Sequence, residues 1–466
     1  MVLRYESSRG EAPTLGFADV LLAGLADDGG LYVPEEWPKL EVADSAESYT
    51  DSASYTDIAV DVMFPFVDGS LTRDELARMV DDAYATFDAP EVTPLVELGD
   101  GLHLLELFHG PTLAFKDVAL QLVGRLFDHE LARRGERVTI VGATSGDTGS
   151  AAIEALRDRD AIDVVILHPK GRVSEVQRRL MTTVDSPNVH NVAVDGTFDD
   201  CQDLVKAMFA DPAFRQRQQL SAVNSINFAR VMAQTVYYVV AHRRLGGGPV
   251  SFAVPTGNFG NVYSGFGAMR MGVPIRRLVI GSNSNDILTR FLETGTMSIQ
   301  EVHATLSPAM DIQVSSNLER LLFELIGHDG PRIAELMAQF RGEGTVTFPP
   351  ELLGAVSESF SGSRWSDEET LAEMRATFEA TGRVVDPHTA VGLAAARSAP
   401  RDPDVPMVVL ATAHPAKFPD AVEEAVGVRP ALPAHLSDLF DRTEHVDELP
   451  NDLSAVQAYV ARATGR

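Results

Sequence analysis

Short apolar runs alternate with amphipathic stretches from about residue 100 onward. Residues 137–158, RVTIVGATSGDTGSAAIEALRD, read as a strand, a Gly/Ser/Thr turn and a helix, and residues 163–181, DVVILHPKGRVSEVQRRLM, repeat that order. Further strand-like runs are VHNVAVDG, PVSFAVPTG, RRLVIGSN and VPMVVLATA, with helical patterns such as FARVMAQTVYYVVAHRRL between them. Strands that alternate with helices predict an α/β protein with parallel sheets covered on both faces.

The first hundred residues have a different pattern, in which helices are separated by polar breaks. Residues 16–38 read as a helix stopped by Gly-Gly and then by Pro, and residues 47–57 as a polar loop leading into a helix. Thr72, with Glu75 three residues later, is a typical start for a second helix over residues 72–87. We therefore expect a mostly helical N-terminal domain over residues 1–98, a large α/β domain over 99–140 and 245–466, and a small α/β domain over 141–244.

Composition narrows the class of protein. The formal net charge of -28 argues against a nucleic-acid partner, because phosphate contacts need clustered Lys and Arg. Cys201 is the single cysteine, which excludes an intramolecular disulfide and a thiolate metal cluster. No run approaches the length of a membrane span, and the N-terminus lacks a signal-peptide core. A cytoplasmic protein with no membrane partner is the expectation.

One lysine stands out in a chain that mostly uses arginine for its positive charge. The five lysines are Lys39, Lys116, Lys170, Lys206 and Lys417, and Lys116 follows a Gly-Pro turn in residues 110–117, GPTLAFKD. Arginine serves equally well as a surface charge, but its guanidinium stays protonated, whereas a lysine amine loses its proton when burial or a nearby cation lowers its pKa. Lys116 is therefore a candidate nucleophile.

Residues 254–262, VPTGNFGNV, predict a phosphate site between a strand and a helix. Gly257 and Gly260 let the backbone turn inward, so that N–H groups of Gly257, Asn258, Phe259, Gly260 and Asn261 converge on an anion at a helix N-terminus. The loop has no Lys or Arg, so it would hold a phosphate through backbone dipoles alone, as suits a permanently held cofactor. An ordinary strand-to-helix turn is the alternative interpretation.

Residues 142–151, GATSGDTGSA, form a second candidate loop. They lack the Gly-Lys-Ser/Thr ending of a nucleotide-binding P-loop. Thr144, Ser145, Asp147 and Thr148 instead offer hydroxyls and a helix N-terminus suited to a small carboxylate. No pair of histidines has the spacing of a zinc site, so no metal is expected, and His109 and His414 are interpreted as packing or backbone-binding residues.

Together these features are the parts that pyridoxal 5'-phosphate chemistry requires. They are a lysine, a backbone phosphate cup, a loop that suits a carboxylate and a loop with a hydroxyl group, all in a parallel α/β protein. Lys116 would form a Schiff base with the coenzyme, and the 257–261 loop would hold its phosphate.

Seven motifs carry a resemblance to a known family: FHGPTLAFKD, GATSGDTGSAA, VDGTFDDCQ, NSINFARVMAQ, VPTGNFGNV, DPHTAVG and ATAHPAKF. In this order they resemble the threonine synthase family, in its longer bacterial and fungal form, and the first residues resemble that family's N-terminal domain. The resemblance implies a fold type II pyridoxal-phosphate enzyme that converts O-phospho-L-homoserine and water to L-threonine and phosphate.

The resemblance also implies roles for single residues. Thr412 would face the pyridine nitrogen of the coenzyme, and Asn227 and Arg230 would bind the substrate phosphate, with Lys170 and Ser174 as weaker candidates. Two alternatives stay open: a related phospho-lyase that yields 2-oxobutyrate, and a non-catalytic ligand-binding relative, which predicts a lost lysine or a degraded phosphate cup. We expect a monomer or a homodimer.

Overall fold

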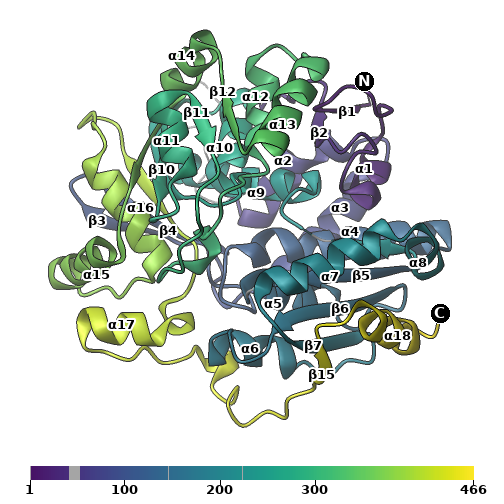
Figure 1. The fold of residues 1–466 in the computed structure, drawn as a ribbon. Coiled ribbons are helices and arrows are strands. Elements are labelled where there is room, and N and C mark those ends of the chain that lie inside the picture. The colour runs from purple at the N-terminus through teal and green to yellow at the C-terminus, as the bar shows by residue number, and fades with distance from the viewer. Residues whose placement is uncertain (1, 41–52, 145, 223) are drawn as a thin grey trace.

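The structure is a computed structural model, and it describes residues 2–40, 53–144, 146–222 and 224–466. Two sheets organise the chain, one of six strands in the order β13-β10-β9-β14-β4-β3 and one of five in the order β15-β7-β6-β5-β8 (Figure 1). All neighbouring strands within these two sheets are parallel except β3 and β4. The prediction of parallel sheets in an α/β fold is confirmed.

The strands of the large sheet are β3 (Leu95–Gly99), β4 (Leu102–Glu106), β9 (Val250–Pro255), β10 (Ile275–Ser282), β13 (Phe360–Arg364) and β14 (Met407–Ala411). Those of the small sheet are β5 (Val138–Ala143), β6 (Ile162–Pro169), β7 (Val189–Asp195), β8 (Leu220–Ser221) and β15 (Asp447–Pro450).

Helices cover the large sheet on both faces, which agrees with the mostly apolar sequences of its central strands. In β9, Phe252 and Val254 pack into the core around α9 (Phe228–Arg244) and α10 (Gly260–Met271), whereas Ala253 packs on the other side with α16 (Pro387–Ser398). Alternate side chains of a strand point to opposite faces, so this strand needs apolar residues throughout. α4 (Lys116–Arg134) lies beside α9, and α15 (Asp367–Thr381) and α17 (Pro419–Val426) lie outside α16.

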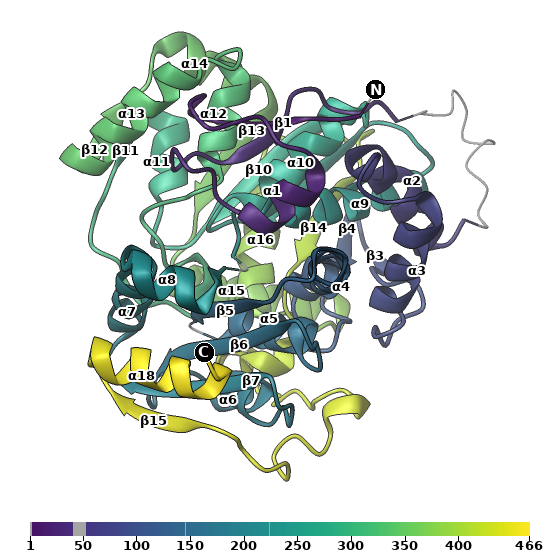
Figure 2. The same cartoon turned by 90° about the vertical axis from the view of Figure 1, so that its right-hand side faces the viewer.

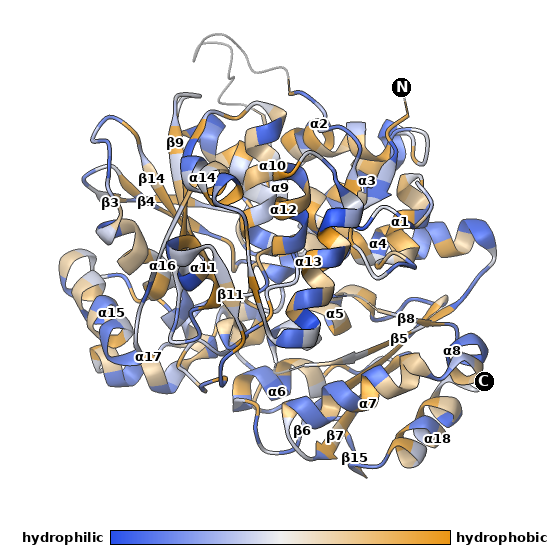
Figure 3. Ribbon diagram, turned by 45° about the horizontal axis from the view of Figure 1, so that its top comes forward, coloured by the Kyte–Doolittle hydropathy of each residue, from blue (hydrophilic) through white to orange (hydrophobic). Residues whose placement is uncertain are grey.

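The small sheet is built in the same way. α5 (Asp147–Leu156) and α6 (Glu175–Thr182) cover the face toward α4, and α7 (Phe198–Ala210), α8 (Pro212–Gln218) and α18 (Leu453–Thr464) cover the other face. Figure 3 shows apolar strands inside and helices with mixed apolar and polar faces outside.

The N-terminal region packs against α9 and α10. It contains β1 (Tyr5–Ser7), α1 (Phe17–Ala23), β2 (Tyr32–Pro34), α2 (Tyr55–Val67) and α3 (Arg73–Tyr84). The predicted cap is confirmed, since Thr72 and Glu75 form a capping box. Helix α1 is shorter than predicted because it ends at Gly24 rather than at the Gly-Gly pair. The predicted polar loop over 47–57 lies mostly outside the described residues, and α2 begins at Tyr55.

The C-terminal segment shows where the strand pairing differs from the expected domains. β15 pairs in parallel with β7, so residues 447–450 belong to the small sheet although they were expected in the large domain (Figure 2). β5 begins at Val138, before the expected boundary at residue 140. Long-range strand pairing leaves no local signal, so an expectation built on chain order misses it. The other boundaries stay predictions.

The remaining elements lie outside the two main sheets. They are α11 (Ile287–Thr294), β11 (Thr296–Ser298), η2 (Pro308–Met310), α12 (Leu318–Leu325), α13 (Gly330–Glu343), β12 (Thr345–Thr347), α14 (Pro350–Ser359), η3 (Pro415–Lys417) and η4 (Ala434–Leu436). Leu436 of η4 packs against Val176 and Leu180 of α6. Among the described helices, none has the length and apolar character that crossing a membrane requires.

Candidate functional site

The turn that precedes Lys116 is attached to the end of β14. The Phe115 N–H donates to the Thr412 carbonyl at 2.9 Å, and Ala114 forms a bridge with Ala413. Thr412 follows β14 directly, and Lys116 is the first residue of α4. The chain therefore brings Lys116 and Thr412, which are distant in sequence, to the carboxyl end of the same strand, where open α/β sheets bind ligands.

Asp117 stabilises this turn from within. It is fully buried, and its carboxylate accepts hydrogen bonds from the Thr112 N–H at 2.8 Å and the Thr112 hydroxyl at 2.6 Å. Burial raises the pKa of Asp117 to about 6, although these hydrogen bonds oppose the rise. The arrangement fixes the residue next to Lys116.

Lys116 is a buried amine with a loose partner. Only 8% of the residue is exposed, and its Nζ lies 3.4 Å from Oδ2 of Asp147. Burial lowers the pKa of Lys116, the positive charges of Lys417 and Arg230 lower it further, and Asp147 opposes them. A lowered pKa makes the uncharged, nucleophilic amine accessible nearer to neutral pH.

Asp147, the first residue of α5, is shared by two lysines. Lys417, which is fully buried, lies 2.7 Å from Oδ1, and Gln177 of α6 donates to the same oxygen at 2.9 Å. Burial alone would raise the pKa of Asp147, but the charges of Lys417 and Lys116 hold it well below its usual range. Asp147 is therefore a carboxylate at any pH of interest.

The loop between β9 and α10 has the form of an anion cup. Two backbone carbonyls of the loop accept hydrogen bonds from neighbouring side chains. The Gly257 carbonyl accepts from the Ser315 hydroxyl at 2.7 Å, and the Asn258 carbonyl accepts from the Asn317 amide at 2.9 Å. Phe259 adopts a left-handed conformation with φ of 62°, and α10 starts at Gly260. Within the described residues, the N–H groups of residues 257–260 have no acceptor. These free donors at a helix N-terminus suit a phosphate.

Close packing behind this cup explains Gly257. A Cβ atom at this position would lie 2.7 Å from the Ala309 carbonyl oxygen, which leaves no space for a side chain. Ala309 is held in turn by His388, because its N–H donates to Nε2 of His388 at 3.2 Å. The other ring nitrogen, Nδ1, lies 2.7 Å from Asp386, which is fully buried. Asp386 and His388 of the DPHTAVG motif thus support the cup from α16.

Arg230 is a buried charge without an acceptor. It lies in the first turn of α9 and is 4% exposed, and its Nε and Nη1 have no hydrogen-bond partner among the described residues. Burial lowers its pKa to about 10, so it is still a cation at neutral pH. A buried guanidinium without an acceptor costs several kcal/mol, of the order of a lost charged hydrogen bond or more, which points to an anion that completes the site.

Other predicted residues have structural partners. The Thr144 hydroxyl accepts from the N–H groups of Gly146 at 3.0 Å and Gly149 at 2.9 Å, so it shapes the loop before α5. The Asn227 side chain caps α9 by accepting from the Ala229 N–H, and donates to the Leu21 carbonyl. Both of its polar atoms are thus engaged within the fold. Thr148 is partly buried in the first turn of α5, and Ser145 lies outside the described residues.

The two weaker candidates differ in position. Lys170 is exposed, and its Nζ contacts Glu448 at 2.7 Å and Asp195 at 3.7 Å, so it contacts none of the other candidates. Ser174 caps α6 and hydrogen-bonds to Gln177, which contacts Asp147. Ser174 thus reaches the site through Gln177.

His109 and His414 are bound as structural residues. His109 lies 2.9 Å from Asp88 and 2.8 Å from Glu106, and Nδ1 of His414 accepts the Ala416 N–H at 3.1 Å. His414 thus binds the backbone as expected, whereas His109 pairs with two carboxylates, a role that the sequence interpretation did not include.

Sequence reasoning missed three residues that contact the site: Gln177, His388 and Lys417. His388 and Lys417 lie in motifs already quoted, DPHTAVG and ATAHPAKF, so their position in a motif was the available signal. Gln177 had no such signal, since one glutamine in an amphipathic helix is unremarkable in sequence.

The side chains fit pyridoxal phosphate. Lys116 supplies a buried amine for the aldehyde, the free N–H groups of residues 257–260 suit its phosphate, and the Thr412 hydroxyl sits on the same strand end as Lys116. Lys116 and Lys417 share one carboxylate, Asp147, and the buried Arg230 has no ion pair among the described residues, in a chain of net charge -28. This local excess of positive charge favours anionic ligands.

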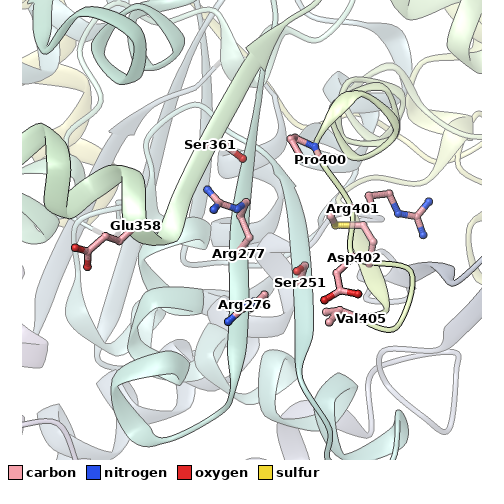
Figure 4. A pocket seen from close by; sticks show the side chains of 10 residues that line it. Ser251, Arg276, Arg277, Glu358, Ser361, Pro400, Arg401, Asp402 and Val405 are labelled. Carbon is pink, nitrogen blue, oxygen red and sulfur yellow. The ribbon is translucent and has the colours of Figure 1, made fainter.

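A second hollow lies at the opposite edge of the large sheet. It has a volume of about 650 Å³ and is lined by residues at the starts of β9, β10 and β14, among them Ser251, Arg276, Arg277 and Arg401 (Figure 4). Arg277 and Arg401 donate to backbone carbonyls of Phe360 and Asp100. This hollow is remote from the strand ends that carry Lys116, and we do not regard it as the active site. No cluster of three potential metal ligands occurs in the described part of the chain.

Comparison with known proteins agrees with this site. Residues 87–340 match the family model "Pyridoxal-phosphate dependent enzyme", so the chain is a pyridoxal-phosphate-dependent enzyme of fold type II. Residues 4–84 match "Threonine synthase N terminus", and residues 389–460 match "Threonine synthase, C-terminal". The chain belongs to the threonine synthase family.

Individual relatives are similar over the whole chain. A threonine synthase from Pseudomonas aeruginosa is 51% identical, and the alignment covers 100% of this chain and 99% of that protein. The crystal structure of pyridoxal-phosphate-bound threonine synthase from Brucella melitensis is 50% identical with a TM-score of 0.97, covering 100% of both chains. Threonine synthase from yeast is 38% identical with a TM-score of 0.94, covering 100% of this chain and 99% of that one.

Proposed function

We propose that the chain converts O-phospho-L-homoserine and water to L-threonine and phosphate, with the substrate phosphate bound by Arg230. The unpaired, buried guanidinium of Arg230 is the observation that carries this proposal. Arginine presents a planar fork of donors that matches phosphate geometry, and the Arg230 charge also lowers the pKa of Lys116, so the two groups are close enough to interact.

Coenzyme binding is assigned to residues around Lys116. Lys116 would attach the coenzyme, the Thr412 hydroxyl would face its ring nitrogen, and backbone N–H groups of Gly257, Asn258, Phe259, Gly260 and Asn261 would hold its phosphate. When bound, pyridoxal phosphate supplies the electron sink that stabilises negative charge on the substrate carbon atoms.

The first part of the reaction is proton removal. The uncharged Lys116 amine takes the proton from Cα of the substrate and then one from Cβ, which requires the lowered pKa that burial and nearby cations give it. The Cγ–O bond then breaks with its electron pair on the phosphate oxygen. Arg230 neutralises the phosphate dianion as it departs.

The second part adds water. Hydroxide from one water molecule bonds to Cβ, one proton goes to each of Cγ and Cα, and the third proton goes to the released phosphate, so that the atoms of substrate and water equal those of threonine and phosphate. The α-carboxylate of the substrate would bind at the N-terminus of α5, where Ser145 and Thr148 offer hydroxyls and the helix dipole favours an anion. Thr144 would act by holding that loop in place, because its hydroxyl binds two N–H groups.

The test measures three products in one tube. The purified protein is incubated with pyridoxal phosphate and O-phospho-L-homoserine, and phosphate, threonine and 2-oxobutyrate are measured together. We expect threonine equimolar with phosphate. Phosphate matched by 2-oxobutyrate, with threonine absent, would show the alternative phospho-lyase activity instead.

We also propose that the protein acts in the cytoplasm as a monomer or homodimer. The exposed large apolar side chains are scattered along the described chain, from Val2 to Val446, and a strongly negative surface repels further copies. Size-exclusion chromatography with light scattering would give the mass directly, and a tetramer would contradict the proposal.

A further inference from the structure

Lys417 is the second buried lysine of the site, and the proposed reaction does not use it. It is the last residue of η3, it is completely buried, and its Nζ donates to the Thr112 carbonyl at 2.8 Å and contacts Asp147 at 2.7 Å. Thr112 belongs to the turn that presents Lys116, and Asp147 begins α5. The Lys417 ammonium therefore joins three separate segments at one point.

The two lysines bind Asp147 unequally. Oδ1 of Asp147 receives Lys417 at 2.7 Å and Gln177 at 2.9 Å, whereas the partner of Oδ2 within the described residues is Lys116 at 3.4 Å. A carboxylate whose charge is already compensated at short range attracts a second ammonium less strongly. Lys417 thus takes the stronger ion pair, and Lys116 keeps the weaker one.

The charged or titratable groups near Lys116 and its partner Asp147 come from five elements. Asp147 lies on α5, Arg230 on α9, Lys417 on η3, His388 on α16, and Asp117 follows Lys116 on α4. Of these, Asp147 is the carboxylate that contacts the Lys116 amine, while Asp117 is directed at Thr112. Whether Asp147 is occupied by Lys417 therefore decides how strongly the protonated form of Lys116 is stabilised.

We propose that Lys417 is a positioning residue that occupies Asp147 and thereby leaves the Lys116 amine free to lose its proton and react. This inference rests on the proposed role of Lys116 as the reactive lysine. It explains why a fully buried lysine is placed beside the reactive one, where a neutral residue would fill the same volume without a second charge to bury. The direction of the Lys116 pKa shift, to which Lys417 contributes, agrees with it.

The test measures the amine itself in the full-length protein freed of coenzyme. Trace acetic anhydride labels uncharged amines, so the rate of acetylation against pH gives the titration midpoint of each lysine. The chain has only five lysines, which peptide mapping can separate, and exposed Lys206 serves as the internal reference. Because coenzyme and substrate are absent, a negative result here is distinct from a negative threonine assay.

Lys417→Met keeps the volume and removes the charge. We expect the Lys116 midpoint to rise by roughly one pH unit, so that acetylation of Lys116 relative to Lys206 falls about tenfold at pH 7.5. Lys417→Gln, which keeps a donor for the Thr112 carbonyl, should shift the midpoint in the same direction if the Met variant folds poorly. Lys170→Met removes an exposed lysine and should leave the midpoint unchanged.

Asp147→Asn separates a positioning role from a purely structural one. In that background Lys417→Met has no carboxylate to release, so only the direct repulsion between the two ammonium groups is lost, and we expect a clearly smaller rise of the Lys116 midpoint than with Asp147 present. The proposal is overturned if Lys417→Met and Lys417→Gln leave the midpoint unchanged with Asp147 present, or if the shift is as large with Asn at that position.

Discussion

Two buried arginines, Arg230 on α9 and Arg320 on α12, differ in how far the fold supplies acceptors for their donor atoms. Burial lowers the pKa of both to about 10, so both are cations inside the protein. Arg320 donates to the Tyr32 and Ile226 carbonyls and to the Asn317 side chain. Arg230 lacks such acceptors for Nε and Nη1 among the described residues. The fold compensates the charge of Arg320 and leaves two donor atoms of Arg230 without an acceptor among the described residues.

The difference lies in the neighbouring chain and not in the arginines. Arg320 binds the segments that carry the N-terminal region and the phosphate cup, because Asn317, which it contacts, also holds the Asn258 carbonyl. Arg230 contributes to the electrostatics of Lys116 instead. Removing each guanidinium should therefore damage different properties of the protein.

The largest effect is expected from Arg230→Met in catalysis. Losing a charged contact to the substrate phosphate costs about 2–5 kcal/mol, so kcat/KM for O-phospho-L-homoserine should fall roughly 30- to 5,000-fold. The free energy of unfolding should stay equal or rise by about 1 kcal/mol, because an unpaired buried charge is removed. Steady-state kinetics and urea unfolding of the same preparation measure both. A variant that is as active as the parent would remove Arg230 from the site.

Arg320→Met should lower the stability of the protein and leave its substrate kinetics nearly unchanged, which is the opposite of the result expected for Arg230→Met. Three buried acceptors lose their donor, so we expect a loss of about 3 kcal/mol or more in the free energy of unfolding. The substrate KM of the molecules that remain folded should change little. Urea denaturation followed by circular dichroism measures the loss, and Lys at position 320 is the matched control because it keeps the charge. Unchanged stability would mean that the contacts of Arg320 are not structural.

The contrast between the two arginines was only partly predictable from sequence. Arg230 was selected through the NSINFAR motif, and nothing local in LERLLFEL distinguishes Arg320 from a surface residue. The acceptors of Arg320 come from residues 32, 226 and 317, which only the folded chain brings together. Asn227 shows the reverse case, because an Asn before an apolar run is a typical helix cap, and this signal was available beside the family motif.

The distance between interacting residues also explains which other features could be predicted from the sequence and which could not. Alternating strands and helices, Lys116 and the 257–261 loop depend on short stretches of sequence, and the fold and the coenzyme follow from them. Gln177, Lys417 and β15 act through partners more than a hundred residues away in the chain or in a separate element, so periodicity and motif spacing carry no information about them. Ser145 lies outside the described residues, and its role stays a prediction.

A smaller effect should appear as protection by inorganic phosphate. In the holoenzyme the coenzyme fills the cup, so added phosphate has the Arg230 position to bind. At ten times its dissociation constant, it should stabilise the protein by about 1.4 kcal/mol, seen as a rise in Tm. Arg230→Met should abolish the rise, and Arg320→Lys should retain it. An equal rise in Tm for Arg230→Met would mean that phosphate binds at a site other than Arg230.

The smallest effect extends the comparison to two histidines on either side of Phe108. Both ring nitrogens of His109 face carboxylates, and although burial opposes it, hydrogen bonds to Glu106 and Asp88 raise its pKa. His414 accepts the Ala416 N–H, and burial, followed by the charge of His109, lowers its pKa to about 4. As with the arginines, the partners decide whether a buried charge is tolerated.

For His414 the sign of the pH effect follows from this lowered pKa. The unfolded chain takes up a proton below about pH 6.5 while the folded chain takes one up only near pH 4, so His414 costs stability as the pH falls through that window. Between pH 6.5 and 5.5, His414 should lower the free energy of unfolding by about 1 kcal/mol. His414→Asn keeps an acceptor for Ala416 and should flatten this part of the profile, measured by urea unfolding at several pH values. His109→Asn is the counterpart, and it should remove stability at low pH, where the protonated ring is paired. If His414→Asn leaves the slope unchanged between pH 6.5 and 5.5, the ring is protonated in the folded protein and the contrast with His109 fails.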